Sequence, residues 1–431
     1  MSQKKNTEHE QVTVGLDIGT TKIVAIVGRK NEHGKIEILG LGKSDSIGVQ
    51  RGMVANIDRT VESIRKAIAE AEAEADININ TVHVGIAGQH IRSYQHRGST
   101  IRENPEATIS QKEIDELIQK MGRISCEPNE KIISVIPQDY MVDQVNYTKE
   151  PIGWTGGNLE GNFHIITGQV TAAKNIARCV KEAGLYMQEM ILEPIASSAA
   201  VLSEEEKEAG VVLVDVGGGT TDVAIFQDNI IRHTAVIPFG GNIITEDVMK
   251  GCNIIRNYAE LLKIKYGSAI PTPDMLNRMI SVPGLQGRPH REISMHNLAS
   301  IIQARMGEIL EAVVMEIDRS GYEKNLAAGV VLTGGGARLK NIKQFTEFTT
   351  GLDTRIGLPT DHIAGNMVEK IASPIFSTSV GLMMMGLQSM PQTKEKNEGN
   401  KEEENKETSR NGNIFKSIID KIFDSREDAL E

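Results

Sequence analysis

The chain alternates short apolar runs with polar turns, a pattern that predicts strands buried in a sheet. Residues 211–226 hold two runs of β-branched and aliphatic residues around a turn that contains three glycines, two threonines and two aspartates. Residues 12–28 repeat this order, with a strand that ends at Asp17, a Gly-Thr-Thr turn and a second strand. Each stretch therefore predicts a buried hairpin with a polar tip.

The elements after each hairpin also repeat. Residues 35–42 predict a third strand, and residues 57–72 carry apolar positions at helical spacing, with Asp58 as the expected N-cap. In the second repeat, residues 230–236 predict the third strand and residues 243–250 the helix. The repeated order indicates an internal duplication and an α/β fold with two halves.

Two segments interrupt these halves. Residues 82–166 predict an inserted α+β subdomain, with a helix at 111–123 and strands at 131–135, 139–145 and 163–171. Residues 251–310 predict a mainly helical subdomain, with helices at 257–266, 273–280 and 295–314.

Two further helices are expected to connect the halves. Residues 192–202 follow a predicted helix at 172–183 and are rich in small residues, which allow helices to approach closely. Residues 373–386 resemble them and contain a run of methionines. Core packing explains this run better than a soft binding surface does.

Composition narrows the class of protein. A chain of 431 residues is long enough for two cores, and its net charge of −11 argues against a general nucleic-acid binder. The three cysteines lack metal or disulfide spacing, which favours a reducing compartment. We expect neither a signal peptide nor a membrane-spanning segment.

The composition changes at residue 391. Residues 391–412 contain no large apolar side chain, which predicts a disordered linker with a reach of about 25 Å. Residues 413–424 then predict a short amphipathic helix. Its apolar face consists of Ile414, Phe415, Ile418, Ile419, Ile422 and Phe423. Such a helix can dock on a partner, on its own body or on a membrane, and the large aliphatics with Phe favour the membrane. The acidic end, 425–431, weakens any attraction to anionic lipid.

The glycine turns indicate phosphate binding. Glycine allows backbone N–H groups to form an anion-binding concavity, and threonine hydroxyls add donors. Asp17 and Asp215 fit such a site only if a cation such as Mg²⁺ lies between them and the phosphates, reached through water. Lys22 can contact a terminal phosphate. A third glycine turn at 333–339 can approach a sugar or base. One such turn alone is equally a hairpin loop.

With these motifs the chain resembles the actin and Hsp70-like ATPase superfamily. The resemblance implies Mg-ATP between two facing α/β halves. The residues it assigns to nucleotide are Asp17, Gly19, Thr20, Thr21, Lys22, Asp215, Gly217, Gly218, Gly219, Thr220, Thr221, Gly334, Gly335, Gly336 and Arg338. Glu260 and Lys263 contact the base or ribose, or form a solvated ion pair; both alternatives stay open.

The resemblance also bears on hydrolysis. Relatives with fast turnover hold an acidic or amide residue that we align with Leu192, two positions before Pro194. Glu193 is expected to point elsewhere. We therefore predict a slow ATPase at most, and no catalytic residue is assigned.

The insert, linker and tail helix narrow the resemblance to the FtsA family of bacterial cell-division proteins. This resemblance implies that copies of the chain assemble into filaments at the septum, on the cytoplasmic side of the inner membrane. It also implies that the chain anchors the FtsZ ring and recruits later division proteins. The FtsZ tail peptide is acidic and would bind the 251–310 subdomain, where Arg291 and Arg305 are candidates.

This resemblance divides the chain as follows: 11–81 and 167–205 form the first core, 82–166 the insert, 206–250 and 311–390 the second core, 251–310 its outer subdomain, and 391–412 and 413–424 the linker and helix. Three alternatives remain. A pilus-assembly scaffold resembling PilM needs no tail helix. A superfamily phosphotransferase needs a catalytic Asp outside the turns, and a chaperone needs a longer C-terminal domain.

Overall fold

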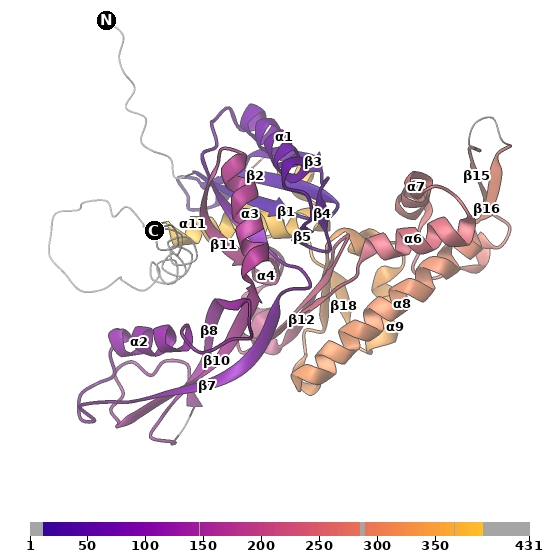
Figure 1. Cartoon of the computed structure of the whole chain (residues 1–431). Coiled ribbons are helices and arrows are strands. Elements are labelled where there is room, and N and C mark those ends of the chain that lie inside the picture. Colours follow the sequence, from indigo (N-terminus) through magenta and orange to yellow (C-terminus); the bar gives the residue numbers. More distant parts are fainter. Residues whose placement is uncertain (1–11, 146, 285–288, 366, 391–431) are drawn as a thin grey trace, which may run out of the picture.

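The computed structural model describes residues 12–145, 147–284, 289–365 and 367–390. The predicted linker and amphipathic helix lie outside these residues. Two halves and an insert make up the described fold, with the start of the first half in indigo, the insert in violet and most of the second half in rose to orange (Figure 1). In this part of the chain, no helix is both long and apolar enough to cross a bilayer.

The first half is built on a six-stranded sheet in the order β11-β6-β1-β2-β3-β19. Its strands are β1 (Val12–Ile18), β2 (Lys22–Lys30), β3 (Ile36–Asp45), β6 (Thr81–Ile86), β11 (Tyr186–Leu192) and β19 (Ile363–Ala364). The helices α1 (Ile57–Ala75) and α3 (Val170–Glu182) bury their apolar residues against it. A two-stranded ribbon, β4 (Val49–Gln50) with β5 (Met53–Val54), precedes α1.

The second half repeats this arrangement with a five-stranded sheet in the order β14-β13-β12-β17-β18. Its strands are β12 (Val211–Val216), β13 (Thr221–Gln227), β14 (Ile230–Ile237), β17 (Val330–Thr333) and β18 (Thr354–Ile356). In both sheets an antiparallel hairpin joins a third antiparallel strand on one side and parallel strands on the other. The predicted duplication is therefore visible in the sheet topology.

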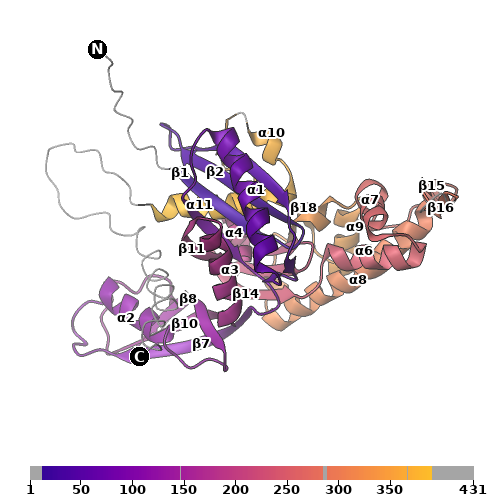
Figure 2. The same cartoon turned by 45° about the horizontal axis from the view of Figure 1, so that its top comes forward.

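Four helices pack against the second sheet or form its outer subdomain, which extends away from the first half (Figures 1 and 2). These are α6 (Gly241–Cys252), α7 (Arg256–Tyr266), α8 (Met295–Ser320) and α9 (Ile342–Thr350). A hairpin of β15 (Met279–Val282) and β16 (Arg291–Ser294) completes the subdomain. The helix predicted at 273–280 is therefore wrong. Only a 3₁₀ turn forms, at Pro273–Met275, and the alternating burial of β15 follows a strand period.

The insert is a four-stranded antiparallel sheet, β7-β10-β8-β9, covered by α2 (Gln111–Met121). Its strands are β7 (Arg92–Ile101), β8 (Glu130–Val142), β9 (Tyr147–Thr148) and β10 (Asn158–Gln169). Two predicted strands are thus one, because β8 continues through Pro137 at a bulge beside Gln138. The division above begins the insert at residue 82, whereas β6 belongs to the large sheet.

The insert contacts β14 of the second half, although it interrupts the first half. The side-chain amide of Gln138 donates a buried hydrogen bond to the Ile231 carbonyl at 2.7 Å. Ser93 and Gln95 donate to the carbonyls of Thr234 and Arg232 at 2.6 and 2.8 Å. We call these bonds the insert–β14 contact.

Two helices connect the halves and pack together. They are α4 (Glu193–Val201), which leads through α5 (Glu204–Ala209) to β12, and α11 (Ser377–Ser389), which follows α10 (Val368–Ile371) and lies along the first sheet. A Cβ on Gly381 of α11 would lie 1.8 Å from the Ala196 carbonyl of α4, so glycine permits this crossing. Met383 and Met384 of α11 are buried in the core and Met385 is partly buried, so core packing explains the run as predicted.

One capping prediction is wrong. Asn56, rather than Asp58, caps α1, because its extended backbone lets its side-chain oxygen accept from the Arg59 N–H at 3.0 Å. Asp58 lies within the first helical turn.

Candidate functional site

A cleft of about 460 Å³ lies between the two halves, and the three glycine turns line it. It brings together nearly all the side chains and glycines that the sequence assigns to nucleotide. These are Asp17, Gly19, Thr20, Thr21, Lys22, Asp215, Gly217, Gly218, Gly219, Thr220, Glu260, Lys263, Gly334, Gly335, Gly336 and Arg338. Thr221 differs, since it is fully buried beneath the turn and its hydroxyl donates to the Phe239 carbonyl at 3.0 Å.

The turns of the two halves face each other at close range. A Cβ on Gly218 would lie 1.9 Å from the Thr21 hydroxyl, and one on Gly219 would lie 2.5 Å from the Thr20 hydroxyl. Glycine is therefore required where the second turn meets the first. The result is a row of backbone amides and hydroxyls from both halves, which suits a chain of phosphates.

The first turn places a cation beside an acid. Lys22 Nζ lies 3.4 Å from Asp17 Oδ2, and the Asp17 side chain is buried while Lys22 remains partly exposed. The two groups lie at opposite ends of the Gly-Thr-Thr turn, on β1 and β2. Lys22 is thus held at the cleft, where its charge can meet a phosphate oxygen.

Four carboxylates line the cleft together: Asp17, Glu193, Asp215 and Asp222. Burial, followed by Asp17 and its neighbours, raises the pKa of Glu193 well above its usual value. Burial also raises the pKa of Asp215, and burial with the charges of Asp215 and Asp17 raises that of Asp222. The repulsion among these carboxylates is relieved when a cation binds or when some of them are protonated.

The cluster fits Mg²⁺ held partly through water. Its donors are hard carboxylate oxygens, and Oδ1 of Asp222 is buried without a hydrogen-bond partner. Within the described residues, no three His, Cys, Asp or Glu side chains are arranged to hold a metal directly. Mg²⁺ usually binds few protein ligands directly, and water and phosphate oxygens complete its coordination.

Glu193 lines the cleft, so the expectation that it points elsewhere is wrong. Leu192 ends β11 and is buried outside the cleft, whereas Glu193 is the first residue of α4. A Cβ on Gly85 of β6 would lie 2.8 Å from Glu193 Cγ, which shows how closely the Glu193 side chain passes β6. The argument for slow hydrolysis from Leu192 therefore no longer holds.

The sequence reasoning also missed Asp222, Ser197 and Thr378. Asp222 and Thr378 line the cleft, and both Ser197 and Thr378 contact Asp215. Asp222 could have been predicted, because it is the second aspartate of the glycine turn that begins at Asp215. The two hydroxyls carried no local signal, because they reach Asp215 from helices 18 and 163 positions away in sequence.

Glu260 and Lys263 form the predicted ion pair, while their contact with a base or ribose stays a prediction. Lys263 Nζ lies 2.8 Å from Glu260 Oε2, and both residues line the cleft. Lys263 also donates to the Gly241 carbonyl at 2.9 Å, and burial lowers its pKa. The pair thus forms one polar wall of the cleft.

The third glycine turn also lines the cleft. Gly334 has φ +79°, and a Cβ there would lie 2.2 Å from Asp215 Oδ1. Gly335 has open space beside it, and Arg338 follows at the end of a 3₁₀ turn. The turn therefore presents bare backbone to the cleft.

The two arginines considered for a partner peptide are engaged within the chain. Arg305 forms ion pairs with Asp247 at 2.5 Å and with Glu308. Arg291 is exposed and donates to the carbonyls of Cys252 and Asn253 at 3.1 and 2.6 Å. The apolar residues of the predicted membrane helix lie outside the described residues.

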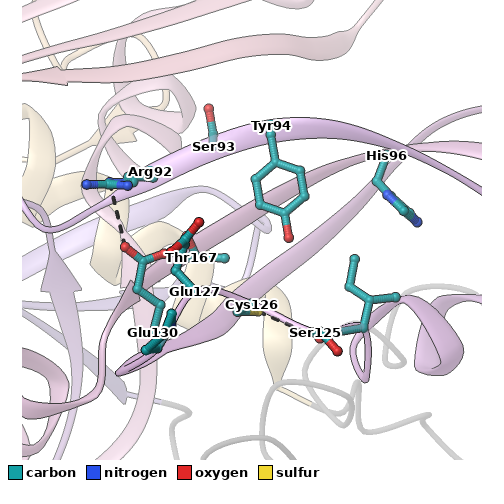
Figure 3. Close-up of a pocket in the computed structure, with 11 residues that line it drawn as sticks. Arg92, Ser93, Tyr94, His96, Ser125, Cys126, Glu127, Glu130 and Thr167 are labelled. Carbon is teal, nitrogen blue, oxygen red and sulfur yellow. Dashed lines mark hydrogen bonds and ion pairs between the residues drawn. The ribbon is translucent and has the colours of Figure 1, made fainter.

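A second, more open cavity of about 720 Å³ lies on the insert (Figure 3). Tyr94 and His96 of β7 line it opposite the loop that carries Cys126. At one end Glu130 pairs with Arg92 at 3.6 Å and accepts from the Thr167 hydroxyl at 2.9 Å. None of the residues assigned to nucleotide lines this cavity.

Comparisons of the sequence identify relatives along most of the chain. The family described as "Cell division protein FtsA" matches residues 212–381, and "SHS2 domain inserted in FTSA" matches residues 88–167. The cell division protein FtsA of Neisseria meningitidis is 43% identical over 85% of this chain and 88% of its own length. Those of Pseudomonas aeruginosa and Escherichia coli are 39% and 32% identical, each over 88% of this chain and 90% and 91% of their own lengths.

Solved structures share the fold at low identity. A chain of the PilM-PilN type IV pilus biogenesis complex has a TM-score of 0.64 at 15% identity, covering 87% of this chain and 98% of its own. MreB5 of Spiroplasma citri, bound to ADP, has a TM-score of 0.52 at 14% identity, with 87% and 96% covered. The fold is thus actin-like, with an inserted SHS2 domain.

Proposed function

This chain belongs to the FtsA family of cell division proteins, and from that premise we propose that it binds ATP with Mg²⁺ between its two halves. The observation that carries the proposal is the meeting of the two glycine turns, where only glycine fits between them and the threonine hydroxyls. Asp17, Glu193, Asp215 and Asp222 line the same cleft, where Lys22 pairs with Asp17.

The residues of the cleft have different proposed roles. The backbone of both turns, with Thr20, Thr21 and Thr220, binds the phosphates, and Lys22 offsets their negative charge. Asp17 and Asp215 would hold Mg²⁺ through its waters, with Asp222 and Glu193 close by. The metal, when bound, supplies the positive charge that screens phosphates from carboxylates. The wall of Glu260 and Lys263 faces the nucleoside.

Hydrolysis, where it occurs, would depend on Glu193. Its carboxylate is the acidic group at the start of α4, outside the phosphate turns. An ionised Glu193 can orient and deprotonate a water, while a protonated one cannot. Because burial and the neighbouring acids raise the pKa of Glu193, Mg²⁺ bound beside it would favour its ionised form.

We further propose that the chain polymerises at the cytoplasmic face of the membrane, at the septum, and anchors the FtsZ ring there. The membership of the family supports the role in division, and the amphipathic pattern of residues 413–424 supports the membrane attachment. The insert is a candidate surface for later division proteins. The acidic FtsZ tail would have to compete for Arg305, which Asp247 and Glu308 already engage, so Arg291 is the better candidate.

Calorimetry with ATP and Mg²⁺ tests the nucleotide proposal. Asp215→Ala is expected to weaken Mg-dependent ATP binding by roughly tenfold or more, because a charged group in contact with the hydrated metal is lost. Asp247→Ala is the matched control, since this Asp lies on α6 outside the cleft lining. Equal ATP affinity in wild type and folded Asp215→Ala would contradict the proposal.

A further inference from the structure

The carboxylate of Asp215 is held by hydroxyls from both connecting helices. Ser197 Oγ, on α4, donates to Asp215 Oδ2 at 2.9 Å. Thr378 Oγ1, on α11, lies 3.3 Å from the same oxygen and 3.0 Å from Ser197 Oγ. Ser197 is fully buried, and Thr378 and Asp215 are nearly so.

The two hydroxyls hold Asp215 at its Oδ2 oxygen. Each hydroxyl has one proton to donate, so Thr378 bonds Asp215 directly or supports it through Ser197. Ser197 makes the shorter bond and is the principal donor. On the other oxygen, Oδ1, Gly334 leaves just enough room for the carboxylate. The orientation of Asp215 is therefore set by neighbours that do not themselves belong to the phosphate turns.

The two hydroxyls come from the elements that join the halves. α4 leads from the first sheet to β12, and α11 returns from the second half to lie along the first sheet. Their crossing is tight at Gly381 and Ala196, so a rotation of one half against the other must change how the helices cross. Any such change alters the two bonds to Asp215.

We propose that Ser197 and Thr378 are positioning residues, which orient Asp215 toward Mg²⁺ and tie its orientation to the crossing of α4 and α11. The assignment rests on the proposed binding of Mg-ATP. In this role both hydroxyls act through Asp215, although Thr378 also lines the cleft. Their loss should therefore change the Mg²⁺ requirement of ATP binding and leave Mg-free nucleotide binding unaltered.

Each helix offers a matched control next to the residue of interest. Ser198, adjacent to Ser197 on α4, donates to the Ile195 carbonyl at 2.7 Å. Ser379, adjacent to Thr378 on α11, donates to the Phe376 carbonyl at 3.0 Å. Both are buried hydroxyls, and neither bonds Asp215. Removing them costs a comparable local hydrogen bond without touching the carboxylate.

The experiment measures binding of a fluorescent ATP analogue to the full chain while Mg²⁺ is titrated, and again in excess chelator. Ser197→Ala is expected to raise the half-saturating Mg²⁺ concentration roughly tenfold, as for loss of a hydrogen bond to a charged group. Thr378→Val should raise it by a smaller factor, and Thr378→Ser should restore it. Ser198→Ala and Ser379→Ala should match wild type, and all variants should bind alike in chelator.

The outcomes separate the two proposals. If wild type shows no Mg-dependent ATP binding, the proposed function fails and this assignment falls with it. If wild type responds to Mg²⁺ but Ser197→Ala behaves like Ser198→Ala, the assignment alone is overturned. Should Ser197→Ala not fold, the pair Thr378→Val and Thr378→Ser decides, and equal Mg²⁺ requirements in both would overturn it.

Discussion

At the scale of single residues, the cleft concentrates acids more than the sequence suggests. The glycine turns point to Asp17 and Asp215 because those acids end apolar strands directly before glycines. Glu193 escaped prediction because its orientation depends on where β11 stops and α4 begins, one residue after Leu192. Boundaries of that kind are decided by packing between distant elements, which local sequence does not encode.

The crowded acids predict a pH-dependent stability. The pKa of Glu193 is raised in the folded chain, so the folded state retains a proton that the unfolded state has lost. Stability of the nucleotide-free chain should then fall as pH rises from the ordinary Glu pKa toward the folded pKa. Glu193→Gln removes this penalty, and it should raise the Tm by about 2 °C or more at pH 8 and less at pH 5.

Thermal unfolding in chelator, at both pH values, measures this effect. Glu116→Gln, an exposed acid on α2, serves as the control and should leave the Tm unchanged at either pH. A Glu193→Gln variant less stable than wild type at pH 8 would show that the carboxylate is compensated within the folded chain. The same variant should lose ATP hydrolysis while retaining ATP affinity.

At the scale of elements, hairpins were the most predictable part of the fold. Strict apolar runs around glycine turns located β1 with β2 and β12 with β13, because both sheets bury those strands on both faces. β7 was not predicted, since most of its side chains are exposed and polar. The sequence does not distinguish β15 from a helix, because a four-residue strand carries too short a pattern.

The amphipathic helix predicted at 413–424 yields a test at the same scale. Burial of a Phe side chain contributes roughly 1.5–3 kcal/mol, and a charge in its place adds a cost. Phe415→Glu is therefore expected to reduce vesicle binding by roughly tenfold or more. Ser417→Glu introduces the same charge on the polar face and should reduce it far less. Equal loss in both variants, measured by co-sedimentation, would mean that charge and not apolar insertion governs attachment.

At the scale of the whole molecule, the duplication and the place of the insert could be predicted, because repeated motifs and a break between them are visible in sequence. The insert–β14 contact could not. It is made by side chains of Ser93, Gln95 and Gln138 that reach backbone carbonyls more than 90 positions away. The insert thereby spans both halves, and its orientation depends on the position of β14.

Gln138→Ala tests that contact. The variant leaves the buried Ile231 carbonyl without its donor, which should cost about 1–3 kcal/mol of stability. It should also accelerate hydrogen exchange in β8 and β14. Gln95→Ala removes a similar bond at an exposed site and should have a smaller effect. Equal exchange rates in wild type and Gln138→Ala would mean that the contact does not hold the insert in place.

The central claim, that the chain is an ATP-dependent membrane anchor for FtsZ, is tested most directly by the amount of FtsZ that sediments with lipid vesicles. Single tails should bind weakly, and filaments that carry many tails should bind firmly through high effective concentration. With wild type, ATP and Mg²⁺, FtsZ should sediment with the vesicles. It should remain in solution when residues 413–431 are deleted or when Asp215→Ala replaces wild type. Sedimentation of FtsZ to the same extent with all three proteins would contradict the account.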